Sequence, residues 1–132
     1  MRKAVLDTNI LVSALWSQQG NPYKIVEMFF KKEITLYYVP EIIEEYTEVL
    51  NRTKLNFSNN KVSSLLQEIR KNGILADSTV STVLFSDESD RIFYDTAKTN
   101  DAILITGNLK HFPKEPFIMT PNDFLTKLEQ GV

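Results

Sequence analysis

The run AILIT at residues 102–106 is the most apolar stretch of the chain and decides its fold. An unbroken apolar run of this length predicts a strand that is covered on both faces, as in a parallel sheet. The shorter run AVL at residues 4–6, which ends in Asp7, has the same character. Segments with apolar residues at helical spacing separate such runs, and this alternation indicates parallel strands joined by helical crossovers.

The rest of the chain divides into alternating strands and helices on either side of these two strands. We expect strands at residues 4–6, 34–39, 74–76, 102–106 and 117–119. We expect helices at residues 10–16, 22–30, 40–50, 61–70, 87–99 and from 121 onwards, with a frayed end at 130–132. Asn9 and Asn21 are predicted to cap the first two helices. This order predicts an α/β fold, a three-layer α/β/α sandwich with a central parallel sheet of four to five strands.

Length and composition restrict the function. The chain of 132 residues is expected to form one domain, residues 1–132. It has no Cys and one His, which excludes a thiol nucleophile, a disulfide framework and a multi-histidine metal site. The net charge of −2 argues against holding long nucleic acid by bulk phosphate attraction. The apolar runs are too short to cross a membrane, and Asp7 interrupts the first one, so we expect a cytoplasmic protein without a signal peptide.

Polar side chains follow both of the buried strands. Asp7 comes directly after the first, and Thr106, Gly107 and Asn108 end the other. Ligands of open parallel sheets bind beyond the carboxyl ends of the strands, so these side chains are expected at one ligand-binding edge. Each also has a plainer interpretation, Asp7 as a turn or cap residue and Thr-Gly-Asn as a strand-end turn.

The helix at residues 40–50 carries four glutamates, of which one borders its apolar stripe. Glu45 lies three residues after Ile42 and four before Val49, so at about 100° per residue it is the glutamate that points towards the sheet. The other three are expected to be solvated: Glu41, Glu44 and Glu48.

Asp90 lies near the start of the helix at residues 87–99. It precedes Phe93 and Tyr94 by three and four residues and shares their inward face, whereas Asp95 points away from it. The alternative is that Asp90 only stabilises the first helical turn through the helix dipole.

Asp7, Glu45 and Asp90 are therefore expected to converge on one cleft. Clustered carboxylates repel one another, and at least one takes up a proton unless a cation compensates the charge. Hard divalent cations with oxygen ligands, Mg²⁺ or Mn²⁺, suit such a site. A metal of this kind supports in-line phosphoryl displacement, so no side chain has to be the nucleophile.

Four motifs resemble the successive motifs of the PIN-domain family. They are LDTN at residues 6–9, EY at 45–46 before VL at 49–50, DESDR at 87–91, and ITGN at 105–108. The order and spacing match from Val5 to about Phe112. The chain most resembles the bacterial single-domain, VapC-like toxin components of toxin–antitoxin systems, and TGNLKHFP at residues 106–113 is typical of one branch of them.

The resemblance implies a metal-dependent endoribonuclease in which Asp7, Glu45 and Asp90 bind metal and are catalytic. It also implies a homodimer that a cognate antitoxin neutralises. Many PIN nucleases carry a fourth acid where this chain has Asn108. Asparagine ligates through its amide oxygen without adding charge, so a second metal would be held more weakly. Three further residues beside these motifs are expected to support the site: Thr8, Asn9 and Thr106.

The basic residues are scattered, and the unique histidine has a plain interpretation. Arg52, Lys54 and Arg91 lie near the acidic positions in sequence and are the candidates for RNA phosphate contacts. His111 is expected to pack or hydrogen-bond within a loop. Asp87 is expected to point away from the partners of Asp90.

Two other functions stay open. Asn108 favours a catalytically weak PIN-like scaffold that binds RNA or a protein partner. An aspartate after the first strand also occurs in haloacid-dehalogenase-like phosphatases, but those carry a second aspartate two residues on, where this chain has Asn9.

Overall fold

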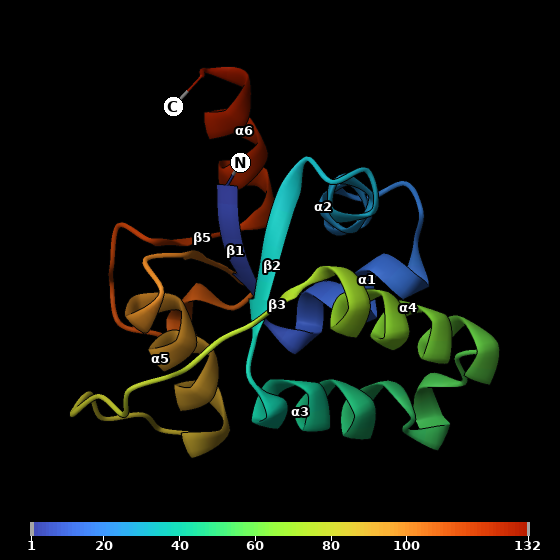
Figure 1. Cartoon of the computed structure of the whole chain (residues 1–132), viewed down its shortest axis with the longest axis horizontal. Helices are drawn as coiled ribbons and strands as arrows, with labels where there is room; N and C mark the ends of the chain where they lie inside the picture. The colour runs from blue at the N-terminus through green and yellow to red at the C-terminus, as the bar shows by residue number, and fades with distance from the viewer. Residues whose placement is uncertain (1, 132) are drawn as a thin grey trace.

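The computed structural model describes residues 2–131, and Met1 and Val132 lie outside the described residues. Five parallel strands form one sheet in the order β3-β2-β1-β4-β5 (Figure 1). The strands are β1 Arg2–Leu6, β2 Ile34–Tyr38, β3 Ile74–Leu75, β4 Ile103–Ile105 and β5 Ile118–Met119. The predicted α/β class and the parallel sheet are confirmed, although β3 and β5 are only two residues long.

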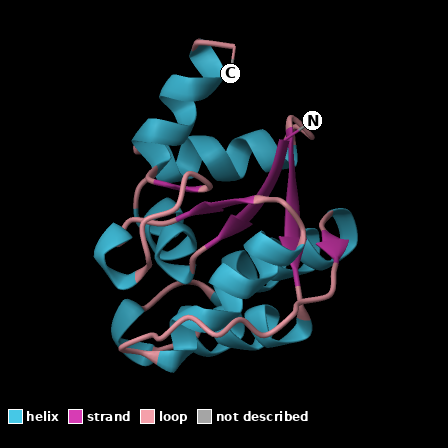
Figure 2. Cartoon of the chain, turned by 90° about the vertical axis from the view of Figure 1, so that its left-hand side faces the viewer, coloured by secondary structure: helices cyan, strands magenta, loops and turns pink. Residues whose placement is uncertain are grey.

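Helices cover both faces of the sheet. They are α1 Thr8–Trp16, α2 Asn21–Phe30, α3 Pro40–Leu50, α4 Asn59–Asn72, α5 Arg91–Thr99 and α6 Pro121–Glu129, with short 3₁₀ helices η1 Thr53–Leu55, η2 Glu88–Asp90 and η3 Leu109–His111. Helix α5 lies on one side, against β1 and β4, whereas α1, α2 and α4 lie on the other (Figures 1 and 2). The sheet is the middle layer of the predicted sandwich.

Three helix starts differ from the sequence-based prediction. Asp7, and not Asn9, is the N-cap of α1, because the strand ends one residue before it and the helix begins at once. Gly20 precedes α2, so Asn21 is already its first helical residue. The helix expected from residue 87 begins as the 3₁₀ turn η2 and becomes α-helical only at Arg91.

The order of the strands reverses between β1 and β4, which are neighbours although about a hundred residues separate them in the chain. The two strands form the buried centre of the core, where Val5, Leu6, Leu104 and Ile105 are almost fully covered. Their carboxyl ends meet, since the backbone N–H of Asp7 donates to the carbonyl of Ile105 at 3.0 Å. Such a reversal is where open parallel sheets bind ligands. None of the helices described between residues 2 and 131 is long and apolar enough to span a bilayer.

Candidate active site

Asp7 is held rigidly at the point where the strand order reverses. One carboxylate oxygen, Oδ1, accepts from the backbone N–H of Thr8 at 2.8 Å, and Oδ2 accepts from the hydroxyl of Thr106 at 2.8 Å. The residue is only 7% exposed. Burial raises the pKa of Asp7 above its usual range, and the hydrogen bonds from Thr106 and Thr8 act in the opposite direction.

The turn after β4 is tied to the start of α1. The hydroxyl of Thr106 also accepts from the backbone N–H of Asn108 at 3.0 Å, and the N–H of Gly107 donates to Oδ1 of Asn9 at 3.2 Å. The three residues predicted to support the site therefore lie around Asp7. The Thr8 hydroxyl is buried and has no hydrogen-bond partner among the described residues, so Thr8 acts on Asp7 through its backbone. Asn108 is exposed on this turn.

Glu45 is the half-buried glutamate of α3, while Glu41, Glu44 and Glu48 are exposed, as the helical spacing predicts. The adjacent Tyr46 is buried, and its hydroxyl donates to the carbonyl of Leu6, which fixes α3 at the end of β1. Burial raises the pKa of Glu45 most. The charges of Glu48, Asp7 and Asp87 raise it further, and that of Arg52 opposes them.

Asp90 ends the 3₁₀ turn η2 at the start of α5. Burial, followed by the charges of Asp7 and Asp87, raises the pKa of Asp90 to about 6. The charge of Glu45 acts in the same direction, and that of His111 opposes it. The structure therefore brings the three predicted carboxylates within electrostatic reach of one another.

Two residues at this site were not assigned to it from the sequence. Nδ1 of His111 lies 3.6 Å from Oδ2 of Asp90. Asp87 is exposed, and its Oδ1 accepts from the N–H and the hydroxyl of Ser89, while its charge acts on both Asp90 and Glu45. Asp87, expected to point away from the partners of Asp90, is the N-cap of the 3₁₀ turn η2 and acts on both Asp90 and Glu45 through its charge. The signal for His111 is its position four residues after Gly107, at the same sheet edge as Asp7.

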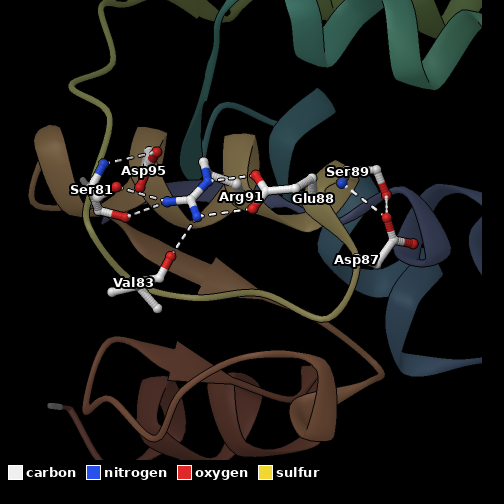
Figure 3. Close-up of polar contacts among 7 residues, drawn as sticks. All are labelled: Ser81, Val83, Asp87, Glu88, Ser89, Arg91 and Asp95. Atoms are coloured by element: carbon white, nitrogen blue, oxygen red, sulfur yellow. Dashed lines mark hydrogen bonds and ion pairs between the residues drawn. The ribbon is translucent and has the colours of Figure 1, made fainter.

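The three arginine and lysine candidates differ in their contacts. The guanidinium of Arg91 donates to Glu88, Ser81 and Val83 (Figure 3). These contacts hold the loop that contains Ser81 and Val83, and a contact of Arg91 with RNA phosphate would require one of them to break. Arg52 forms an exposed pair with Glu48 at 2.9 Å, and Lys54 is exposed on η1.

Asp95, expected to point away from the face of Asp90, is 2% exposed. It is covered by the same loop, and its Oδ2 accepts from the N–H of Ser81 at 3.2 Å.

The carboxylate oxygens of this site suit a hard divalent cation, although they do not supply all the ligands that such an ion needs. Among residues 2–131, no three His, Asp or Glu side chains lie in a geometry that would hold a metal ion. However, Asp7, Glu45 and Asp90 are mutually repulsive carboxylates, and cations relieve such repulsion. Mg²⁺ is commonly held by one or two carboxylates, with water and substrate phosphate completing its shell. The residues present fit an ion bound in that way.

Comparisons with known proteins agree with this geometry. A sequence model of the PIN domain family matches residues 3–110, which include all three carboxylates and the turn at Asn108. A similar relative is the archaeal "Uncharacterized protein MJ1680" of Methanocaldococcus jannaschii, 29% identical over 109 residues that make up 80% of this chain and 70% of that protein. PIN domains are nuclease-type folds, generally metal-dependent ribonucleases. Because this match covers most of the chain, the chain belongs to the PIN domain family.

Proposed function

We propose that this protein is an Mg²⁺- or Mn²⁺-dependent endoribonuclease that hydrolyses RNA phosphodiester bonds. The observation that carries the proposal is the set of three carboxylates from three separate elements at the reversal of strand order. Asp7 follows β1, Glu45 lies on α3 and Asp90 ends η2. Their charges interact, with Asp90 linked electrostatically to both of the others. Their mutual repulsion is a reason for a cation to bind there.

In this proposal Asp7, Glu45 and Asp90 hold the ion, with the amide oxygen of Asn108 as an additional ligand. A divalent ion bound there supplies a Lewis acid for hydrolysis of the phosphodiester. Thr106 and the N–H of Thr8 orient the carboxylate of Asp7. In the metal-free protein Asp90 has a pKa of about 6, so at neutral pH it is mostly ionised and available as a ligand.

The positive charges near the site are candidates for orienting RNA. Arg52 and Lys54 are exposed at the end of α3 and on η1, and both follow the helix that carries Glu45. Their contribution is expected to be local, since the net charge of the chain is −2. We propose that they contact phosphates on one side of the cleavage point.

The cellular role that we propose is that of a toxin in a toxin–antitoxin pair, acting as a homodimer. It is supported by the resemblance of residues 106–113 to one branch of the VapC-like proteins. Induced expression of the wild type is expected to arrest growth and degrade RNA, whereas Asp90→Asn is expected to do neither. Growth arrest by both proteins would contradict a nuclease-based toxin role. Light scattering of the purified protein tests the homodimer.

The direct test is calorimetric titration of chelator-treated protein with Mn²⁺, because it requires no knowledge of the RNA. The wild type is expected to bind saturably and Asp7→Asn to lose binding. Glu44→Gln is the matched control, since Glu44 is on the same helix as Glu45 but exposed, and it is expected to bind as the wild type does. Loss of binding in both variants would indicate an effect of net charge and not of the site.

A second candidate function is a catalytically weak scaffold that binds RNA or a protein. It is favoured by Asn108, which brings no charge, and by the lack of a complete three-ligand cage among residues 2–131. An RNA cleavage assay at millimolar Mn²⁺ that compares the wild type with Asn108→Asp distinguishes the two functions. Cleavage that rises in this variant from a detectable wild-type level favours the nuclease. RNA binding without cleavage in either protein favours the scaffold.

A further inference from the structure

A long loop between β3 and α5 lies along one face of α5, and a series of hydrogen bonds holds it there. We call residues 77–85 the strap. The side chain of Asn100 donates to the carbonyl of Asp77 at 2.8 Å, and the N–H of Thr79 donates to the hydroxyl of Thr99 at 2.9 Å. Further along, Ser81 and Val83 are bound by Asp95 and Arg91. The strap therefore runs antiparallel to the helix.

The spacing of these bonds follows from the geometry of the two segments. Arg91, Asp95 and Thr99 are four residues apart and lie on one face of α5, about 6 Å from one to the next at about 1.5 Å per residue. Alternate residues of an extended chain are about 6.6 Å apart. The two repeats match, which is why every second strap residue is bound. From Val80 to Phe85 the burial alternates accordingly, with 80, 82 and 84 exposed.

Arg91 is the residue that joins the strap to the turn bearing Asp90. Its Nη1 donates to the carbonyl and hydroxyl of Ser81 at 2.8 and 3.1 Å, and its Nη2 donates to the carbonyl of Val83. On the other side, Nε and Nη2 donate to the carboxylate of Glu88 at 2.7 and 3.1 Å. Figure 3 shows the guanidinium between the strap on one side and Glu88 on the other.

The five donors of a guanidinium are all used by these five bonds. The side chain is only 18% exposed, and it also lies over the ring of Phe85, 5.1 Å from its centroid. Glu88 begins η2 and Asp90 ends it, so a fixed Glu88 restricts the turn on which Asp90 is carried. Within the turn, the N–H of Asp90 donates to the carbonyl of Asp87 at 3.1 Å, and Oδ1 of Asp87 accepts from the N–H and hydroxyl of Ser89.

We propose that Arg91 is a positioning residue, which clamps the Glu88–Asp90 turn between the strap and α5 and so sets the Asp90 carboxylate for metal binding. The metal part of this inference rests on the proposed function, whereas the restraint on the turn does not. A lysine keeps the charge but has three donors on one atom and cannot bridge two separated groups in this way. The turn therefore requires the planar set of donors of a guanidinium, and not only its positive charge.

The test compares Arg91→Lys with Thr99→Val. The valine variant removes one strap bond, that with Thr79, but leaves Glu88 and the turn untouched, so it controls for loosening of the strap alone. Two quantities are measured: the backbone order parameters of Glu88, Ser89 and Asp90 by NMR without metal, and the affinity for Mn²⁺ by calorimetry. Melting temperatures of both variants serve to detect general destabilisation.

Arg91→Lys is expected to lower the order parameters of the turn and to weaken Mn²⁺ binding by about tenfold, the lower end of the effect seen when groups that orient a metal ligand are lost. Thr99→Val is expected to leave the order parameters of the turn as they are and to change the affinity by less than about twofold. Unchanged order parameters in Arg91→Lys would overturn the inference, and so would a mobile turn with unchanged affinity. If the wild type binds no Mn²⁺, the proposed function fails, and the order parameters alone decide whether Arg91 positions the turn.

Discussion

Asp7 and Asp90 occupy the same site but are held in different ways. Asp7 is fixed by the sheet itself, because both of its oxygens accept hydrogen bonds and its neighbours on either side are backbone of β1 and α1. Asp90 ends a short 3₁₀ turn, in which the side chain of Glu88 is bound by Arg91. Of these two proposed metal ligands, one is held by the sheet and the other by the proposed clamp of Arg91, so the two are expected to respond differently to mutation.

The largest effect is expected from removing either charge. Asp90→Asn should reduce RNA cleavage at least about 100-fold while leaving the circular dichroism spectrum unchanged, since an asparagine keeps the shape but supplies no negative charge for the cation. Asp7→Asn should reduce it equally. Cleavage retained in either variant would show that the reaction does not depend on these two carboxylates.

A smaller effect, which separates the two residues, is expected from Thr106→Val. This change leaves Oδ2 of the buried Asp7 without its hydrogen bond, and an unpaired buried acceptor costs about 1–3 kcal/mol. The variant should unfold at a lower urea concentration and bind Mn²⁺ more weakly, because the pKa of Asp7 rises further. Thr96→Val is the control, since the Thr96 hydroxyl is buried and has no partner among residues 2–131. A control as unstable as Thr106→Val would indicate a packing effect.

A third effect concerns the pH dependence of stability in metal-free protein. The folded-state pKa of Asp90 is raised from 3.8 to about 6, so the folded protein holds an extra proton between these values. The stability associated with that proton is present below about pH 4 and is lost as pH rises through about 6.

Asp90→Asn removes this dependence. It should therefore stabilise the metal-free protein at pH 7, by at most about 3 kcal/mol because solvent weakens the repulsion, and hardly at all at pH 4. Urea unfolding with a chelator at both pH values measures the difference. A stabilisation of equal size at both would show that repulsion of the Asp90 charge is not its cause.

The smallest effect is expected at His111. Its charge lowers the pKa of Asp90, but the side chain is 56% exposed and lies 3.6 Å from the carboxylate, so solvent weakens the interaction. His111→Gln should raise the pKa of Asp90 slightly and change the Mn²⁺ affinity by less than about threefold. A loss of ten times or more would mean that His111 is required to hold Asp90, as Arg91 is proposed to be.

Much of the site was predictable because it depends on local patterns. An aspartate directly after a buried strand, and a glutamate four residues before Val49 on the edge of an apolar stripe, fix the positions of Asp7 and Glu45. Helical spacing likewise excluded the exposed Glu44. Such periodicity is a property of the chain alone, since it follows from the geometry of strands and helices.

Several details that the sequence did not predict depend on contacts between distant segments. Asn9 was expected to cap α1, but it accepts a hydrogen bond from Gly107, which is 98 residues away. The sequence places Arg91 beside Asp90, but its hydrogen bonds to Ser81 and Val83, ten and eight residues earlier, do not follow from that position. The spacing of residues along the chain does not determine which groups a long side chain binds in the folded protein.

The alternation of strands and helices, the burial of β1 and β4, and the carboxylates that face inward from their elements follow from the amino-acid sequence alone. Only the tertiary structure decided that the ends of β1 and β4 are neighbours, that Asp87 and His111 act on Asp90, and that the strap binds α5. The physical reason is that element type follows from residue periodicity over a few turns. Pairing across the sheet and the partners of a guanidinium, in contrast, are set by which distant groups the folded core brings within hydrogen-bond distance.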